Sequence, residues 1–301
     1  MYGNIMVPVD GSKFSEQAIP YASAIAGRAG ARLHVVLVHT PLARLGADIA
    51  PTLLMGQWED QYRNKEIDYL NDLIERLGQQ GRDVVAEKLE GDVAHQLVER
   101  AKSNADLLIM ATHGRAGLER AWLGSVADEV VHHVQLPVLL IRPEDDAVRP
   151  KDPRFEHVLV ASDGSEAAAA ATEQAVQLAG LFGSRLTLLR VASMPAGLTS
   201  PYIPHAALID RETTERREKE AEEFLDGVAA KIAKGVTVQT HVARAYHPAH
   251  GILDAITELK CDLVALGTRR HTRLARIVLG SVADKIVRAS PVPVLVGHTK
   301  S

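Results

Sequence analysis

Short apolar runs alternate with segments of helical periodicity from the start of the chain. The first run, at 4–9, ends in Asp-Gly-Ser, and the segment after it carries apolar residues three and four positions apart until Gly30. This spacing predicts an amphipathic helix, whereas a run that is apolar almost throughout predicts a strand buried on both faces. With a second such run at 33–38, the chain is expected to begin with a strand, a helix and a parallel strand.

The alternation continues to the end and divides the chain into two matching halves. In the first half, strands are expected at 4–9, 33–38, 83–89, 107–111 and 138–141, and helices at 15–29, 58–77, 93–102 and 126–134. In the second half, strands are expected at 157–161, 185–191, 236–243, 262–267 and 294–296, and helices at 167–181, 211–233, 249–259 and from Ser281 on. The pattern predicts an α/β fold of two tandem, doubly wound, mostly parallel five-stranded sheets.

A polar segment with prolines separates the two halves. Residues 144–153 show no periodicity and are predicted to be a linker, which gives domains at 1–143 and 154–301. The length of 301 residues suits two domains, each with its own core.

One block of the first half recurs in the second. MATHGRAGLERAWLGSV at 110–126 corresponds to LGTRRHTRLARIVLGSV at 266–282, and LGSVAD is identical in both copies. In each copy an apolar run precedes a loop of small and basic residues, and Gly-Ser then opens a predicted helix. The unpaired N–H groups and positive dipole end of a helix start suit phosphate. A single Gly-Ser pair is more often an ordinary turn and cap, but its repetition in matching contexts favours phosphate binding.

Composition narrows the class of partner and compartment. A formal net charge of -4 gives no sign of a nucleic-acid or membrane-surface protein. The single cysteine, Cys261, precludes an internal disulfide and suits a reducing cytoplasm, where we expect a packed structural thiol. The first residues turn polar too early for a signal peptide, and no apolar run approaches the ~20 residues of a membrane span. We therefore expect a soluble, cytoplasmic protein without nucleic-acid or membrane partners.

The repeated block and the two Asp-Gly-Ser strand ends resemble the universal stress protein family in its tandem two-domain form. The family's nucleotide signature is Gly, two residues, Gly, nine residues, then Gly followed by Ser or Thr. The first half keeps this spacing at 111–125, but alanine replaces the first glycine, at Ala111. The second half keeps it at 267–281, but Arg270 replaces the middle glycine. The resemblance covers nearly the whole chain and implies an adenine nucleotide alpha hydrolase-like fold.

The resemblance also implies a set of nucleotide-binding residues. Asp10 and Asp163, which end the first strand of each half, would lie beside adenine, whose amino group can donate to a carboxylate. Thr40 and Val191 match the position that follows the second strand and packs on the base. The others lie on or after the fourth strand of each half and would contact base, ribose and phosphates: Met110, Ala111, His113, Gly114, Gly124, Ser125, Val126, Leu266, Gly267, Arg270, Gly280, Ser281 and Val282.

The departures from the signature affect which half of the chain is expected to bind a nucleotide. Ala111 adds one methyl group, which is tolerated if its φ stays negative. Arg270 would cost about 1 kcal/mol or more where φ must be positive, and its side chain would fill phosphate space. Alternatively it clamps phosphates, or it belongs to a solvated basic loop. His113 either contacts a phosphate or stabilises the turn. We expect ATP, or ADP or AMP, with Mg²⁺ near Ser125, to bind better in the first half.

Metal binding and catalysis find little support in the sequence. Adjacent His132 and His133 point about 100° apart on a helix, and His247 and His250 lack further ligands, so no metal site is expected. Neither a P-loop, nor a GxSxG elbow, nor a Rossmann glycine motif occurs. We therefore expect no catalytic residues, and a protein that regulates through nucleotide occupancy. Two alternatives stay open: a scaffold with degenerate pockets that acts through protein partners, and a slow ATPase whose phosphate release disappears on Ser125→Ala.

The resemblance further implies how the halves associate. Single-domain family members pair through their last strands, so 138–141 and 294–296 are expected to pair within this chain as an intrachain pseudo-dimer. A homodimer of the whole chain is also compatible with the sequence. The long charged helices at 58–77 and 211–233 are expected to present solvated faces.

Overall fold

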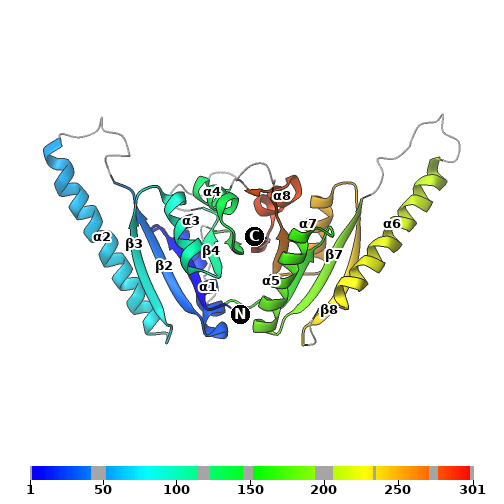
Figure 1. Ribbon diagram of the computed structural model, residues 1–301, viewed down its shortest axis with the longest axis horizontal. Helices are drawn as coiled ribbons and strands as arrows, with labels where there is room; N and C mark the ends of the chain where they lie inside the picture. Colours follow the sequence, from blue (N-terminus) through cyan, green and yellow to red (C-terminus); the bar gives the residue numbers. More distant parts are fainter. Residues whose placement is uncertain are drawn as a thin grey trace. The chain divides into compact units, whose positions relative to one another are not determined.

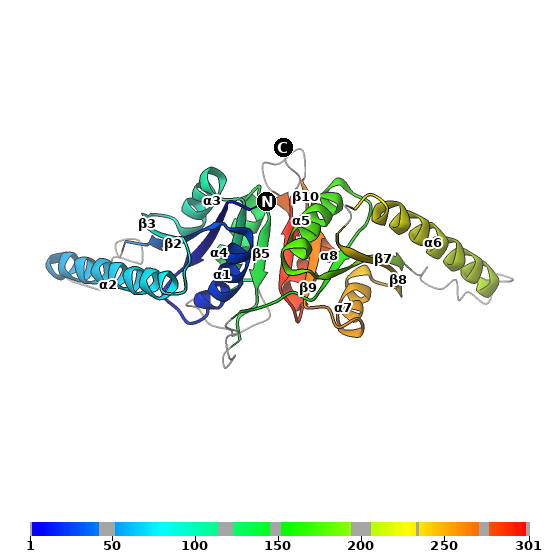
Figure 2. The same ribbon diagram turned by 90° about the horizontal axis from the view of Figure 1, so that it is seen from below.

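The computed structural model describes residues 2–41, 52–113, 123–144, 152–193, 206–232, 235–270 and 277–298. These residues form two compact units (Figures 1 and 2), the first built on Met1–Arg154 and the second on Phe155–Arg270 and Val278–Ser301. Each unit is a parallel sheet with helices packed on it, so the predicted α/β fold of two tandem domains is confirmed. The domain limits and the linker at 144–153 stay predictions.

Unit 1 contains five strands and their connecting helices. The strands are β1 (Asn4–Val9), β2 (Arg32–His39), β3 (Val84–Glu90), β4 (Leu107–Ala111) and β5 (Val138–Ile141). The helices are the 3-10 turn η1 (Ser15–Gln17), α1 (Ala18–Ala29), α2 (Thr52–Gly78), α3 (Val93–Asn104) and α4 (Ser125–His133). The strand order is β3-β2-β1-β4-β5, all parallel. Because right-handed crossovers leave β1 in one direction and enter β4 from the other, a crevice opens between the carboxyl ends of β1 and β4.

Unit 2 repeats this topology. Its strands are β6 (His157–Ala161), β7 (Arg185–Ser193), β8 (Thr237–Ala245), β9 (Leu263–Gly267) and β12 (Val294–Gly297), in the order β12-β9-β6-β7-β8 and all parallel. Its helices are α5 (Glu166–Phe182), α6 (Ala206–Ala229), α7 (Pro248–Glu258) and α8 (Ser281–Ala289). Two short strands that the sequence did not predict, β10 (Arg269–Arg270) and β11 (Ile277–Val278), form a separate sheet.

An aspartate fixes the first strand of each unit to the fourth. Asp106 Oδ2 accepts hydrogen bonds from the amides of Gly3 (2.8 Å) and Asn4 (2.9 Å). Asp262 Oδ2 accepts in the same way from the Glu156 amide (2.7 Å). The central strands β1, β4, β6 and β9 are buried almost throughout, as their uninterrupted apolar sequence predicts. Each crevice therefore rests on a rigid, apolar sheet.

Unit 2 brings its first helix unusually close to the sheet. Helix α5 begins at the N-cap Ser165, whose hydroxyl accepts from the Ala168 amide (3.2 Å), and continues with a run of alanines. A Cβ atom on Gly267 would lie 2.5 Å from the Ala168 nitrogen, and one on Gly297 would lie 2.6 Å from the Ala171 nitrogen. Both glycines are therefore required by the contact between helix and sheet.

Candidate functional site

Each unit contains a cavity at the carboxyl ends of its strands, where the strand order reverses. The cavity of unit 1 measures about 350 Å³ and that of unit 2 about 450 Å³. This is the place at which open parallel sheets bind ligands, and both volumes suit a small molecule.

In unit 1, eight residues predicted from the sequence lie around this one cavity. They come from the ends of β1, β2 and β4 and from the start of α4, and they are Asp10, Thr40, Met110, Ala111, His113, Gly124, Ser125 and Val126. Gly114 lies outside the described residues. Segments more than a hundred residues apart in sequence thus line one cavity.

In unit 2, the corresponding residues also surround one cavity: Asp163, Val191, Leu266, Gly267, Gly280, Ser281 and Val282. The side chain of Arg270 lies outside the described part of the chain. One equivalence needs correction, because β7 ends at Ser193, two residues later than predicted. The pairing of Pro8 with Val36 and of Ala161 with Leu189 shows that Ser193, rather than Val191, corresponds to Thr40. Ser193 also lines the cavity.

The Asp-Gly-Ser sequence orients a carboxylate at each cavity. Asp10 Oδ1 accepts a hydrogen bond from the Ser12 amide (3.0 Å), and Asp163 Oδ1 accepts from the Ser165 amide (2.9 Å). In each turn the glycine between the aspartate and the serine, Gly11 or Gly164, has a positive φ of 80° or 86°, which favours a residue without Cβ. The motif is therefore a turn that aims an acceptor at the crevice.

Helices α4 and α8 point their N-termini at the two cavities. Their N-cap residues, Gly124 and Gly280, have extended backbones and provide no side-chain cap. The amides of the first turn and the helix dipole therefore favour an anion at this end of each cavity. The hydroxyls of Ser125 and Ser281 lie at the same ends.

The two N-cap glycines differ in whether the surrounding structure leaves room for a side chain. The Gly124 amide donates to the Thr112 carbonyl (2.8 Å), and a Cβ on Gly124 would lie 2.8 Å from that same oxygen. A Cβ on Gly280 would meet nothing within 4 Å. Gly124 is thus a packing requirement. His113 is tied to the same loop, since its Nδ1 lies 3.1 Å from Thr112 Oγ1.

The structure also explains why the first signature glycine is dispensable in unit 1. Ala111 is 8% exposed and accommodates its methyl group, and the 3-10 turn η1 follows the Asp10 turn where unit 2 begins a full helix. In unit 2 the corresponding Gly267 lies directly under the first turn of α5.

Other cavity residues were not predicted, because they belong to apolar segments whose pattern indicates only core. In unit 1 they include Val36, Val38, Val93 and Leu97, and in unit 2 Leu189, Arg190, Pro248 and Ile252. They lie near the carboxyl ends of second strands or in the first turns of α3 and α7. Their position near the carboxyl ends of the strands was the one feature of the sequence that could have indicated a place in the cavity wall.

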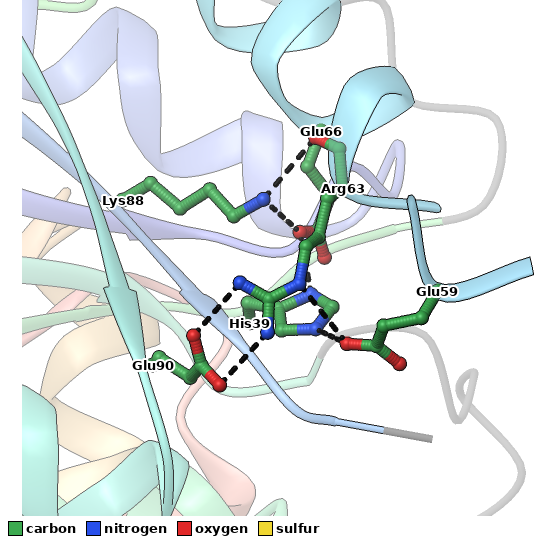
Figure 3. A network of polar contacts seen from close by, with 6 residues as sticks. All are labelled: His39, Glu59, Arg63, Glu66, Lys88 and Glu90. Carbon is green, nitrogen blue, oxygen red and sulfur yellow. Dashed lines mark hydrogen bonds and ion pairs between the residues drawn. The ribbon is translucent and has the colours of Figure 1, made fainter. Parts of the chain in front are cut away.

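A network of charged residues anchors α2 next to the unit 1 cavity (Figure 3). His39, the last residue of β2 before Thr40, is fully buried, with Nδ1 2.7 Å from Glu66 Oε2 and Nε2 2.5 Å from Glu59 Oε1. Lys88 Nζ lies 3.1 Å from Glu66 Oε2. Both ring nitrogens face carboxylate oxygens, so the imidazole at the end of β2 bridges two residues of α2.

The outer part of the network joins α2 to β3. Arg63 donates to both carboxylate oxygens of Glu90, at 2.9 and 2.8 Å, and to Glu59 at 3.2 Å. These contacts lower the pKa of Glu90, with the hydrogen bond from Arg63 as the main cause. Further along α2, burial, followed by the nearby charge of Glu16, raises the pKa of Tyr69. The network and Tyr69 together place α2 beside the turn and strand that form the cavity wall.

Unit 2 buries a smaller cluster away from its cavity. His157 Nε2 lies 2.7 Å from Thr187 Oγ1, and its Nδ1 lies 3.0 Å from the Leu259 carbonyl and 3.6 Å from Cys261 Sγ. Burial lowers the pKa of His157 and raises that of the Cys261 thiol to about 11. A protonated, buried thiol has a structural role, because thiol reactivity depends on the thiolate.

The histidines considered as metal ligands are engaged locally. His132 and His133 have Nδ1 at 2.5 and 2.7 Å from carbonyl oxygens of their own helix, while the rings of His247 and His250 contact each other at a centroid distance of 5.6 Å. Among the described residues, no group of three or more metal-ligating side chains occurs. Nor does any helix in the described ranges have the length and apolar character needed to cross a membrane.

Comparison with known proteins gives a consistent relationship. Residues 1–142 and 154–298 each match the model of the Universal stress protein family. A universal stress protein of Mycolicibacterium smegmatis is 27% identical over 306 residues, covering 98% of this chain and 96% of the relative. One of Methanocaldococcus jannaschii is 32% identical over 149 residues, covering 47% of this chain and 83% of the relative.

The fold matches solved structures as well. The crystal structure of a universal stress protein from Archaeoglobus fulgidus has a TM-score of 0.70 at 22% identity, covering 99% of this chain and 97% of that one. The repeated block, the two matching sheets and the double match to the family model lead to one conclusion: the chain belongs to the universal stress protein family, with two family domains in tandem.

Proposed function

We propose that this protein binds ATP, or ADP or AMP, in the cavity of unit 1 and acts in the cytoplasm as a stress-response regulator through that occupancy. The observation that supports this most is the convergence of eight sequence-predicted residues on one cavity of about 350 Å³. That cavity is lined by a carboxylate, by apolar side chains and by a helix N-terminus without a side-chain cap.

The three parts of the cavity match the three parts of the nucleotide. Asp10, oriented by its turn, accepts from the exocyclic amino group of adenine. Val38 and Met110 provide apolar surface for the base. The amides that follow Gly124 and the Ser125 hydroxyl receive the phosphates, with Mg²⁺ as counter-ion.

The choice of unit 1 rests on the charge and packing of its wall. Among the described residues that line this cavity there is no lysine or arginine, so the base end offers an acceptor and apolar contacts. Such a surface suits adenine. Ala111 lines this cavity and is 8% exposed, so its methyl group is accommodated in the wall.

A matched pair of variants tests the proposal. Ser125 and Ser281 are both exposed and both open their helices, so aspartate at either position suits the helix and places negative charge against a phosphate. Calorimetric titration of ATP with Mg²⁺ should give binding that Ser125→Asp abolishes and Ser281→Asp retains. No heat of binding to the unmodified protein would contradict the proposal and favour a scaffold that acts through protein partners.

Variants of the same site also test whether bound ATP is hydrolysed. A slow ATPase requires release of phosphate from ATP that is lost in Ser125→Ala. Release that persists in this variant would exclude the unit 1 site as its source.

A further inference from the structure

Among the described lining residues, the cavity of unit 2 has an arginine, whereas the cavity of unit 1 has neither arginine nor lysine. Arg190, near the end of β7, lines it, and the guanidinium carbon lies 4.2 Å from the centroid of the Phe224 ring on α6. Stacking on an aromatic face fixes the plane of a guanidinium and leaves its in-plane N–H groups available as donors. The position of the charge is therefore set by the fold.

This cation lies at the same end of the cavity as the turn carboxylate. A Cβ on Gly164, the residue after Asp163, would lie 3.8 Å from Arg190 Nη1, so the guanidinium reaches the turn itself. Asp163 and Arg190 both line the cavity. A guanidinium donor and a carboxylate acceptor thus lie at the same turn beside the cavity.

At the position equivalent to Arg190, unit 1 has a leucine. The strand register places Leu37 where unit 2 has Arg190, because Val36 pairs with Pro8 as Leu189 pairs with Ala161. Leu37 is 1% exposed and belongs to the core. The base end of the unit 1 cavity therefore has the acceptor Asp10, without a cationic donor among its described lining residues.

The two arrangements complement different purines. Adenine offers an amino donor, which a lone carboxylate accepts. Guanine offers N–H donors on its Watson–Crick edge and two acceptors, O6 and N7, that arginine contacts with two parallel hydrogen bonds. We propose that the unit 2 cavity selects a guanine nucleotide, with Asp163 accepting from the guanine N–H groups and Arg190 donating to O6 and N7. This inference rests on the proposed function, since it uses the same division of the cavity into base and phosphate ends.

The test uses the whole chain with unit 1 blocked by Ser125→Asp. Titration with GTP and with ATP, each with Mg²⁺, should give tighter binding of GTP by about 5- to 150-fold, the range of one bidentate base contact. Arg190→Leu, which introduces the residue that unit 1 has in the same register, should reduce GTP affinity to that of ATP. Arg190→Lys keeps the charge without the fork and should lose most of the preference.

Controls separate the specific effect from loss of charge or fold. Arg216→Leu removes an exposed arginine of α6 that does not line the cavity, and should leave both affinities unchanged. The thermal unfolding midpoint of Arg190→Leu, measured in parallel, shows whether unit 2 stays folded. If Arg190→Leu unfolds unit 2, the GTP and ATP affinities of Arg190→Lys provide the test instead.

The outcomes distinguish this inference from the proposed function. Equal affinity for GTP and ATP in the blocked protein, or a GTP preference that survives both Arg190 variants, would overturn the inference. ATP binding to the unmodified protein that is lost in Ser125→Asp would still support the proposed function. GTP binding abolished by Ser281→Asp, in a chain that binds no ATP, would support the inference and contradict the proposed function.

Discussion

Replacing His39 with leucine tests the claim that the buried charged network holds α2 beside the unit 1 cavity. His39 is fully buried, and Glu66, at 2.7 Å from its ring, is 5% exposed. Removing the hydrogen-bond partner of a buried polar group costs about 1–3 kcal/mol, and more when that group is charged. Lys88 still contacts Glu66 at 3.1 Å, so we expect a loss of about 3 kcal/mol. That is a large share of a domain's stability of about 5–15 kcal/mol.

A double-mutant cycle gives the magnitude a sharper test. His39→Leu combined with Glu66→Leu removes the most buried carboxylate of the network together with the imidazole that contacts it, so the double variant should lose less stability than the two single losses added together. His133→Leu, which removes an imidazole bound to a carbonyl of its own helix, is the matched control and should change stability by about 0.5 kcal/mol or less.

Urea unfolding followed by tryptophan fluorescence measures these changes. The chain has two tryptophans, and Trp58 is the neighbour of Glu59 on α2, so a Trp122→Phe background makes the signal specific for this helix. A loss below about 1 kcal/mol in His39→Leu, or additive losses in the double variant, would refute the account of the network.

Three further predictions concern unit 2. Gly267→Ala should destabilise it by about 2 kcal/mol or more in urea unfolding, because its Cβ collides with α5, whereas Gly280→Ala should cost about 1 kcal/mol or less; equal losses would contradict the packing argument. Cys261, buried and with its pKa raised to about 11, should react with the thiol reagent DTNB only as fast as unit 2 unfolds, and rapid reaction of the folded protein at pH 8 would show otherwise. Burial lowers the pKa of His157, so the unfolded state binds more protons and stability should fall as pH drops through about 6.5 toward the folded-state pKa. His157→Gln should flatten this dependence of the urea midpoint between pH 7 and 5.5, and an unchanged slope would assign it to other groups.

The sequence predicted the sheet more accurately than its surroundings. Buried parallel strands are apolar throughout, and the predicted limits of 4–9, 107–111, 138–141 and 157–161 match β1, β4, β5 and β6. Helix α2 instead begins at Thr52, before the predicted residue 58, because Gly56 within it is a poor helix former and suggests a break. Strand β7 continues to Ser193 because its pairing with β8, rather than its hydrophobicity, extends it.

The candidate site was predictable where a turn or a repeat marked it. The Asp-Gly-Ser turns and the two Gly-Ser helix starts do surround the cavities. Arg190 was not predictable, because a single charge in an apolar strand gives no indication of which face or end it reaches. Gly267 matches a nucleotide signature in the sequence, whereas the structure shows that contact with Ala167 and Ala168 requires it. Residue identity alone does not distinguish a ligand contact from a packing constraint.

Hydrogen exchange measured by mass spectrometry, with and without ATP and Mg²⁺, tests the central claim most directly. If ATP occupies the unit 1 cavity, the peptides that cover the end of β4 and the start of α4 should become protected, together with the turn at Asp10. The matching peptides around β9 and α8 should change less. Protection confined to unit 2, or none in either unit at saturating ATP, would contradict the assignment.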